Sequence, residues 1–277
     1  MRLQEKLSVY STEGKALLAT NFYNFETLSG ILQAAKVKKQ PVILQLSESS
    51  IQYLGLDIAA NMGRTALKSF DIEGWLHLDH GSSVEMAHRC LDAGFDSVMI
   101  DASEKQFGEN VKITSEVVKI AERYNANVEA ELGYVAKLGQ EQVAGAYTQP
   151  DEAKRFVETT GINALAIAIG SAHGFYKETP KLQLELLSQI RTATPVALVL
   201  HGSSGIPDDQ LRDAIVRGIS KINLATETKN IFMRTLQKIL RDNEEIDLRK
   251  VFPKATDFVV KLISEKLDIV SAVTVTR

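Results

Sequence analysis

Three histidines of this chain each follow an apolar segment and stand beside small or acidic residues. His80 lies in LHLDHGSS (76–83), His173 in AIGSAHGFYK (168–177) and His201 in LVLHGSSGI (198–206). Three imidazoles with an open fourth position are a common arrangement for catalytic zinc. Such an ion acts as a Lewis acid on a carbonyl or stabilises an enolate. One histidine at a strand end is more often a hydrogen-bonded packing residue, so the prediction of a metal site requires that all three meet.

The other two histidines fit structural roles better. His77 lies inside an apolar strand-like segment, and His88 lies in a helix-like segment with apolar neighbours. Buried polar side chains are normally hydrogen-bonded. Both are therefore expected to be hydrogen-bonded structural residues.

A repeated pattern positions these histidines: a short apolar, β-branched segment ends in small or polar residues, and a longer segment with helical spacing follows. Segments that are apolar nearly throughout are typical of parallel strands covered on both faces. The predicted strands are 16–22, 41–47, 74–80, 97–103, 127–133, 163–170, 195–202 and 219–226. Segments with apolar residues at three- and four-residue spacing predict helices over 27–39, 84–95, 111–124, 150–161 and 207–218.

Eight strands alternating with helices predict a (β/α)8 TIM barrel, an α/β fold. The expected organisation is a single domain over 1–277 with one or two extra C-terminal helices around 253–268. A doubly wound sheet is the alternative, but it favours a glycine-rich turn after the first strand. Here that turn reads NFYNFET and contains no glycine.

Polar residues gather where the predicted strands end. In a barrel all of these ends form one face, which carries the active site. The residues at the eight ends are Asn21, Ser47, Asp79, His80, Asp101, Ser103, Glu129, Glu131, His173, Gly174, His201, Gly202, Ser203, Ser204, Asn223 and Thr226. Their shared position predicts a single site that includes all three strand-end histidines.

A phosphate subsite is expected after the last two strands. Barrels often bind phosphate there through backbone N–H groups and a helix N-terminus. The candidate residues are Gly202, Ser203, Ser204, Gly205 and the segment Asn223, Leu224, Ala225 and Thr226. A short Gly/Ser turn is weak evidence alone, and its place beside a predicted metal ligand strengthens it.

Composition agrees with an ordinary enzyme of small molecules. The chain has 277 residues, of which 24% are charged and 44% hydrophobic, with a net charge of −3. This balance predicts neither nucleic acid nor a membrane as a partner. The N-terminus lacks the apolar core of a signal peptide, and the single Cys90 excludes an internal disulfide. A cytoplasmic protein is expected.

The ordered motifs resemble the class II, zinc-dependent ketose-bisphosphate aldolases, which include fructose- and tagatose-bisphosphate aldolases. The resemblance covers nearly the whole chain. The motifs that carry it are HLDHG (77–81), VMIDAS (98–103), VEAELG (128–133), AIGSAHGFYK (168–177), LVLHGSSGI (198–206) and KINLATE (221–227). It implies a barrel that cleaves a phosphorylated ketose to dihydroxyacetone phosphate and an aldehyde through an enediolate.

The resemblance also implies roles for individual residues. His80, His173 and His201 would bind zinc, and Asp79 would be the acid/base at the C4 oxygen. Asp101 and Glu131 match acidic residues near the metal, where some members hold a second divalent or a monovalent cation. The phosphate would contact Gly174, Gly202, Ser203, Ser204, Asn223, Leu224, Ala225 and Thr226, with Asn21 and Ser47 at other substrate positions.

The loop after the fifth strand departs from the family pattern. The family has two glycines followed by Glu-Asp, whereas this chain reads ELGYVAKLGQEQVAGAYTQP. In relatives a glutamate of this loop removes a proton from dihydroxyacetone phosphate, and Glu141 is the nearest candidate. Lys137 adds a positive charge outside the pattern and is expected to contact a distal anion of the substrate. The substrate could therefore also be the phospho-ketodeoxygluconate of inositol breakdown or another ketose 1-phosphate.

Three alternatives stay open from the sequence. A metal-dependent hydrolase on the same barrel is one, although such enzymes favour an HxH pair on the first strand. A non-catalytic metal-binding barrel is another. A Schiff-base aldolase would need a buried strand lysine, and Lys221 is the candidate.

Family members are commonly homodimers or homotetramers, which is also expected here. The apolar positions of VVKLISEKLDIVSAV (259–273) could form an interface or pack on the barrel.

Overall fold

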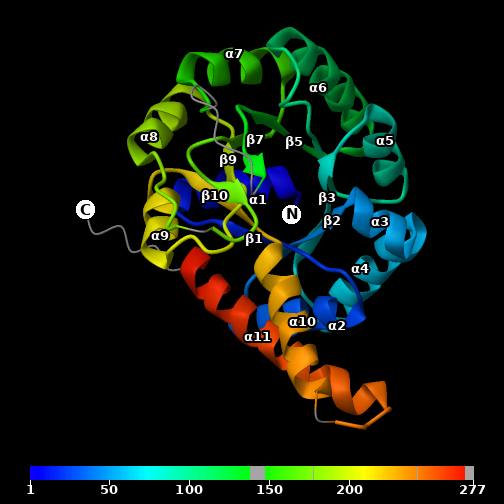
Figure 1. The fold of residues 1–277 in the computed structure, drawn as a ribbon. Coiled ribbons are helices and arrows are strands. Elements are labelled where there is room, and N and C mark those ends of the chain that lie inside the picture. The colour runs from blue at the N-terminus through cyan, green and yellow to red at the C-terminus, as the bar shows by residue number, and fades with distance from the viewer. Residues whose placement is uncertain (138–146, 177, 242, 272–277) are drawn as a thin grey trace.

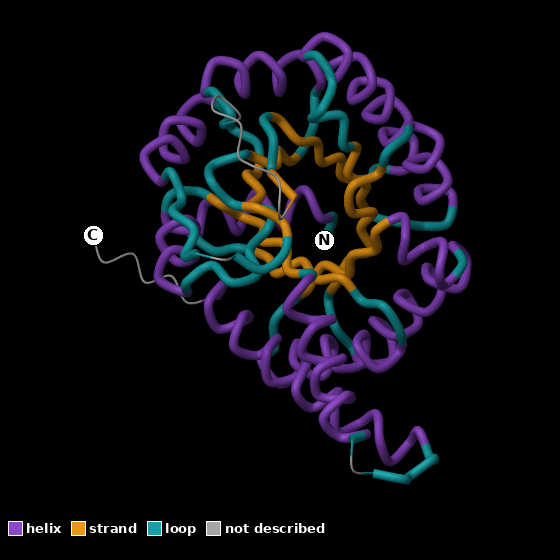
Figure 2. The backbone as a smooth tube through the Cα atoms, viewed as in Figure 1, coloured by secondary structure: helices purple, strands orange, loops and turns teal. Residues whose placement is uncertain are grey.

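Eight parallel strands close into a barrel inside a ring of helices (Figures 1 and 2). The computed structural model describes the chain except residues 138–146, 177, 242 and 272–277. Around the barrel the strand order is β1-β10-β9-β7-β5-β4-β3-β2. The strands are β1 (Leu17–Asn21), β2 (Val42–Ser47), β3 (Gly74–Gly81), β4 (Ser97–Ile100), β5 (Asn127–Leu132), β7 (Ala164–Ile167), β9 (Ala197–Leu200) and β10 (Ile219–Leu224). The predicted (β/α)8 barrel is confirmed, and the doubly wound alternative is wrong.

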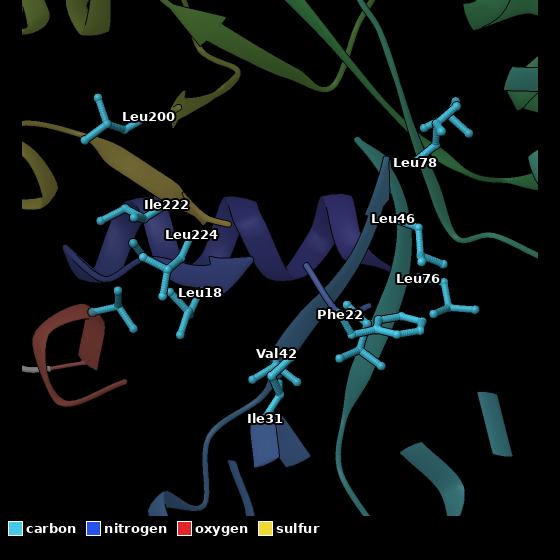
Figure 3. Close-up of a cluster of buried hydrophobic side chains, with 14 of the residues drawn as sticks. Leu18, Phe22, Ile31, Val42, Leu46, Leu76, Leu78, Leu200, Ile222 and Leu224 are labelled. Carbon is cyan, nitrogen blue, oxygen red and sulfur yellow. The ribbon is translucent and has the colours of Figure 1, made fainter. Parts of the chain in front are cut away.

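Seven barrel strands lie within their predicted segments, and β3 extends one residue beyond its segment, to Gly81. The agreement follows because both faces of each strand are covered. Outward side chains pack against the surrounding helices in one large hydrophobic cluster, part of which Figure 3 shows around Leu18, Leu76 and Ile222. Inward side chains fill the barrel. A strand buried on both sides has no reason to alternate strictly between apolar and polar residues.

The helices form the outer ring and close the N-terminal end of the barrel. They are α1 (Leu3–Glu13), α2 (Phe25–Lys38), α3 (Glu48–Leu54), α4 (Leu56–Phe70), α5 (Val84–Asp92), α6 (Phe107–Ala121), the short 3₁₀ helix η1 (Glu122–Tyr124), α7 (Pro150–Thr160), α8 (Leu184–Ala193), α9 (Asp208–Val216), α10 (Thr226–Leu240) and α11 (Leu248–Ser271). The five predicted helix ranges correspond to α2, α5, α6, α7 and α9. The others received no explicit range from the sequence, apart from the C-terminal helices expected around 253–268.

Local chemistry fixes several helix starts. The side chain of Asn24 accepts a hydrogen bond from the backbone N–H of Thr27 at the start of α2. The Ser83 hydroxyl does the same for the N–H of Met86 at the start of α5. Helix α7 begins with Pro150, whose fixed φ suits the first helical position. These caps set where each strand-to-helix loop ends.

Helix α1 plugs the N-terminal end of the barrel, a role that the sequence analysis does not predict. Leu3 and Leu7 of this helix are buried against apolar side chains inside the barrel. This inner cluster is completed by Leu17, Ala19, Ile43, Trp75, Met99, Ala164, Ala166, Ala197 and Val199. One end of the barrel is therefore a dry apolar core.

The C-terminal helix α11 packs back on the barrel ring. Its residues Val259, Ile263 and Leu267 are buried in the outer hydrophobic cluster. Helix α11 lies beside α2 and α10 (Figure 1). Residues 259–273 were expected either to form a subunit interface or to pack on the barrel. Packing on the barrel accounts for these three side chains. Among the described residues, no helix has the length and apolar content to cross a membrane.

Candidate active site

Every second residue of a barrel strand points into the barrel, and in the C-terminal half of the barrel these inward side chains are polar. Along β3, Trp75, His77 and Asp79 point inward, whereas Leu76 and Leu78 belong to the outer cluster. Successive strand residues face opposite sides of a sheet, so every second residue enters the barrel. The inward series on β3 runs from apolar to acidic toward the C-terminal end, which places Asp79 at the mouth.

A bulge lets His80 reach the same mouth as its neighbour Asp79. The pairing of β3 with β4 shifts in register between Leu78 and Gly81. His80 itself has a positive φ of 51°, a conformation that residues other than glycine rarely adopt. In a regular strand His80 would point away from the barrel. The bulge re-aims its side chain, as bulges near active sites commonly do.

The three strand-end histidines meet, as predicted. Nδ1 of His201 lies 2.9 Å from Nε2 of His80. The ring of His173 lies 4.9 Å from the ring of His80 and 5.8 Å from that of His201, centroid to centroid. One nitrogen from each ring lies within 4.8 Å of the others.

A carboxylate orients each of two rings. Asp101 Oδ2 lies 2.7 Å from Nδ1 of His80, and Glu129 Oε1 lies 2.8 Å from Nε2 of His201. A carboxylate accepts hydrogen bonds, so each of these nitrogens carries its hydrogen. The opposite nitrogens, Nε2 of His80 and Nδ1 of His201, are then directed at one another. Carboxylates behind histidine ligands have this role in many metal sites.

The electrostatic environment makes these two rings different. Burial lowers the pKa of His201 well below its usual value, helped by the charge of His80. Burial also opposes the charge of His80, but Asp101, Asp79 and Glu131 raise its pKa to about 9. Two lone pairs would repel each other at 2.9 Å, so the contact between the rings requires a hydrogen, and the raised pKa of His80 favours a proton on its Nε2. A metal ion can replace that proton between the same two nitrogens.

Asp101, after β4, and Glu131, on β5, place two carboxylates beside His80. One oxygen of each carboxylate and one His80 nitrogen lie within 4.8 Å of one another. Burial, followed by the charge of Asp101, raises the pKa of Glu131 to about 8. Its Oε2 atom is buried and has no hydrogen-bond partner among the described residues. An orphaned carboxylate oxygen beside three imidazoles is a donor that a cation can satisfy.

These residues fit a metal ion. Imidazole and carboxylate donors suit zinc and related divalent ions, and here they converge from different strands. The second group, made of His80, Asp101 and Glu131, shares one ligand with the first. The site could therefore hold one ion on the histidines and use the carboxylates as additional ligands.

Asp79 is held beside this cluster by amide groups. Its Oδ2 accepts a hydrogen bond from Asn21 at 2.9 Å, and its Oδ1 one from Asn223 at 3.3 Å. Gln45 donates in turn to the oxygen of Asn21 at 3.1 Å. Burial would raise the pKa of Asp79, but the neighbouring imidazoles and the Asn21 hydrogen bond lower it below its usual value. An ionised carboxylate 3.9 Å from Nε2 of His80 can exchange a proton with a bound substrate.

A glycine allows the loops that carry His173 and His201 to approach. A Cβ added to Gly202 would lie 2.3 Å from the carbonyl oxygen of Ala172, and Gly202 has a φ of 66°. The Tyr176 hydroxyl ties the two loops together, accepting from the N–H of Ala172 and donating to the carbonyl of Gly202, both at 2.7 Å. Tyr176 thus holds the two histidines in place.

The expected phosphate residues surround a small cavity at the same mouth. The cavity has a volume of about 30 Å³. It is lined by Asn21, Asp79, His80, His173, Gly174, His201, Gly202, Ser204, Asn223, Ala225 and Thr226. Thr226 begins α10, so the N-terminus of a long helix faces the cavity, where an anion is favoured. A second cavity of about 440 Å³ lies on the other side of His80 and His173, toward Ser103 and Tyr134.

Three expected substrate residues have other contacts. Leu224 is buried in the outer hydrophobic cluster, so only its backbone could meet a phosphate. The Ser203 hydroxyl donates to the carbonyl of Asn223 at 2.5 Å. Ser47 caps α3 and accepts from the N–H of Ser50. Their side chains position neighbouring backbone.

Two of the expected residues, Lys137 and Glu141, belong to the altered loop after β5. Glu141 lies outside the described residues. The backbone of Lys137 is described: β6 (Ala136–Lys137) pairs with β8 (Ala172–His173), and Lys137 stands opposite His173. The loop therefore starts beside a predicted metal ligand. Its side-chain contacts stay predictions.

The remaining candidates behave as structural residues. Nδ1 of His77 lies 2.7 Å from the Ser97 hydroxyl, and Nε2 of His88 lies 3.1 Å from the Tyr124 hydroxyl. Both structural interpretations are confirmed. Lys221 is fully buried, and its Nζ lies 2.8 Å from Glu129 Oε2. It offers no accessible amine for a Schiff base.

Sequence reasoning missed the residues that support the site from behind. Gln45, Tyr176 and the pairing of Glu129 with Lys221 were given no role. The only available signal was a polar or charged residue within an apolar strand, as for Gln45 and Lys221. Such a residue is expected to be buried and to have a hydrogen-bond or ion-pair partner. The sequence does not identify which residue that partner is.

Comparisons with known proteins agree with this geometry. The family described as class II fructose-bisphosphate aldolase matches residues 1–274. The fructose-bisphosphate aldolase of Geobacillus stearothermophilus is 42% identical over 255 residues, which are 89% of this chain and 88% of that protein. The fructose-bisphosphate aldolase of Helicobacter pylori strain J99 is 35% identical over 289 residues, covering 94% of each chain.

Solved structures show the same barrel. The YdjI aldolase from Escherichia coli K12 aligns with a TM-score of 0.85 at 30% identity, covering 98% of this chain and 96% of that one. A structure described as a putative fructose-1,6-bisphosphate aldolase from Coccidioides immitis aligns with a TM-score of 0.89 at 28% identity and the same coverage. The chain therefore belongs to the class II fructose-bisphosphate aldolase family and is an aldolase of that class, a lyase.

Proposed function

We propose that this enzyme cleaves a ketose 1,6-bisphosphate, of the fructose or tagatose type, to dihydroxyacetone phosphate and a phosphorylated aldehyde. The observation that carries the proposal is the meeting of three histidines with Asp79 on one side and a helix N-terminus on the other. This arrangement offers a metal, an acid/base and an anion site in one mouth. Neither a hydrolase nor a non-catalytic barrel accounts for the family membership together with this set of residues.

His80, His173 and His201 would hold a zinc ion. When bound, the ion supplies Lewis acidity to a carbonyl and neutralises the negative charge of the enediolate that cleavage leaves. Asp101 and Glu131 would add negative charge beside it and could hold a second divalent or a monovalent cation.

Asp79 would move the proton at the C4 oxygen of the substrate. In cleavage its carboxylate accepts the hydroxyl proton, and in condensation the protonated form returns it to the aldehyde oxygen. Asn21 and Asn223 both donate to this carboxylate, which fixes its direction. Positioning of this kind lowers the entropic cost of the proton transfer.

The phosphate next to the ketone would lie at the N-terminus of α10. Gly174, Gly202, Ser204 and Thr226 line that cavity, and a glycine lets a phosphate approach the backbone closely. Backbone amides of the Asn223–Thr226 segment would supply the other donors. Asn21 and Ser47 would meet the remainder of the ketose chain.

The identity of the aldehyde product depends on the altered loop. We keep Lys137 as the proposed partner of the distal anion and Glu141 as the proposed base toward dihydroxyacetone phosphate. A related substrate with another distal anion, such as the phospho-ketodeoxygluconate of inositol breakdown, fits the same metal and phosphate residues. A Lys137→Ala variant with an unchanged KM for every substrate would contradict the proposed contact.

A cleavage assay with a substrate panel tests the proposal. Purified protein would be given fructose and tagatose 1,6-bisphosphates, the inositol-derived compound and other ketose 1-phosphates, with and without EDTA. Release of dihydroxyacetone phosphate would be followed with a coupled enzyme. Chelator-sensitive release is expected, and the preferred substrate identifies the distal group. Release from none of them by zinc-loaded protein would rule out the proposed reaction.

We also propose a homodimer or homotetramer, in a single-domain cytoplasmic enzyme. In support of the oligomer, helices α2, α3 and α4 each expose a large apolar side chain, namely Phe25, Tyr53 and Ile58. Exposed apolar side chains mark subunit contacts when they form a contiguous patch. Sedimentation analysis would give the mass, and a monomer at micromolar concentration would contradict the proposal.

A further inference from the structure

A buried ion pair lies directly beneath the candidate metal site. Glu129 on β5 and Lys221 on β10 are fully buried, and their charged groups are 2.8 Å apart. They project into the barrel from strands that are not neighbours in the sheet. A charge buried without a partner is strongly destabilising, so the pair must be retained or replaced as a unit.

The hydrogen-bond directions around this pair are determined by chemistry. Nζ of Lys221 forms an ion pair with Oε2 of Glu129 at 2.8 Å. An ammonium group only donates, so Lys221 is the donor in its 3.5 Å contact with Nε2 of His77. The neutral His77 ring then carries its hydrogen on Nδ1 and donates to Ser97, 2.7 Å away. The second oxygen of Glu129 accepts from Nε2 of His201 at 2.8 Å. In this chain of contacts the donors point toward Glu129 and Ser97. The amide nitrogen of Asn223 also lies 3.3 Å from Nδ1 and 3.2 Å from Nε2 of His201, and Nδ1 is the nitrogen that can accept from it.

This order of donors has one consequence for the metal site. A neutral imidazole carries a single N–H hydrogen, on either Nδ1 or Nε2. The carboxylate of Glu129 keeps the hydrogen of His201 on Nε2. Nδ1 of His201 is therefore left with its lone pair, directed at Nε2 of His80. If the hydrogen moved to Nδ1, His201 could no longer bind a metal from this orientation.

We propose that Glu129 and Lys221 are positioning residues for His201: Glu129 selects the tautomer that can bind metal, and Lys221 holds Glu129 in place. Neither residue contacts the predicted metal or substrate. The inference rests on the proposed metal site and is independent of which ketose is cleaved. Substitution of such supporting partners typically weakens metal binding about 10- to 100-fold.

Two double variants separate this role from simple packing. Both carry Lys221→Met, which removes the ammonium. One adds Glu129→Gln, whose amide oxygen can still accept from His201, and the other adds Glu129→Leu, which cannot. The charge change is identical, and of the two side chains only glutamine offers His201 an acceptor. Thr160→Val, which removes a buried hydroxyl that donates to the carbonyl of Phe156 within α7, is a matched control outside the candidate site.

Zinc affinity of the apo-protein, measured by competition with a chelating dye, is the main readout. We expect the Leu-containing double variant to bind zinc about 10- to 100-fold more weakly than the wild type. The Gln-containing variant should recover most of the affinity, and Thr160→Val should keep all of it. Equal affinities in the two double variants, whether both strong or both weak, would overturn the inference. Failure of the wild type to bind zinc would instead overturn the proposed metal site.

A second measurement needs no folded Leu-containing variant. Nitrogen NMR of histidine-labelled apo-protein distinguishes the two tautomers by the shifts of the ring nitrogens. The His201 signals would be assigned by their loss in His201→Gln. We expect hydrogen on Nε2 of His201, and hydrogen on Nδ1 would overturn the inference.

Discussion

The two ends of the barrel interior are built from the same strands and have opposite chemistry. At the N-terminal end, Leu17 and Trp75 pack with Leu7 of α1 in a dry apolar cluster. Toward the C-terminal end the inward positions of the same strands are occupied by Asn21 and Asp79. The difference shows that stability and chemistry are separated along the barrel axis, as the fold permits.

The separation is gradual. Between the two ends lies the layer that contains His77, Glu129 and Lys221, which is polar yet fully buried. It contacts the apolar cluster below and His201 above. Such a hydrogen-bonded layer holds the ionisable side chains above it in a rigid arrangement. Substitutions at the two ends should therefore affect different measurable quantities.

The largest effect is expected from loss of a metal ligand at the polar end. His173→Ala removes one of three imidazoles, so zinc binding should weaken severely and cleavage should fall to background. The free energy of unfolding of the apo-protein should change little, because the side chain lies at the mouth. Zinc content by mass spectrometry and thermal unfolding check both statements. A variant that keeps stoichiometric zinc would contradict the ligand assignment.

The next effect concerns proton transfer alone. Asp79→Ala should lower kcat by about 10²- to 10⁴-fold, the usual contribution of an acid/base group. Zinc affinity should stay close to that of the wild type, since the ligands are intact. Steady-state kinetics with zinc-loaded protein provide the test. A reduction of less than about tenfold would mean that another group moves the proton.

The apolar end should show the reverse behaviour. Leu7→Ala creates a cavity in the plug and should cost about 2–5 kcal/mol in the free energy of unfolding. The kcat of the folded fraction should be unchanged. Val9→Ala on the same helix is the control, because Val9 is 39% exposed. Urea unfolding measures the change, and a loss of kcat below the unfolding transition would contradict the separation.

The smallest effect is expected from the residue that supports Asn21. Gln45→Leu removes the hydrogen bond that orients Asn21 and, through it, Asp79. A single hydrogen bond is worth about 0.5–1.5 kcal/mol, so kcat/KM should fall about two- to twelvefold. Zinc affinity should not change. An unaltered kcat/KM would show that Asn21 keeps its position without Gln45.

Much of this architecture was predictable from the sequence because it depends on local patterns. Apolar segments predicted all eight barrel strands, and strand ends identified the three histidines, Asp79 and the acidic pair. The first helix escaped prediction because its role depends on the barrel end that it fills. The helices α3, α4, α8 and α10 were expected only as part of a general alternation.

The sequence by itself determined the barrel, the residues at its mouth and the chemistry that they can support. Only the tertiary structure decided that His80 turns back at a bulge, that Tyr176 joins two loops and that Glu129 pairs with Lys221. The physical reason is that strand order and hydrophobic periodicity are written in neighbouring residues. Hydrogen-bond partners across a barrel, here 92 positions apart for Glu129 and Lys221, are fixed only when the sheet closes and the interior must satisfy every buried charge.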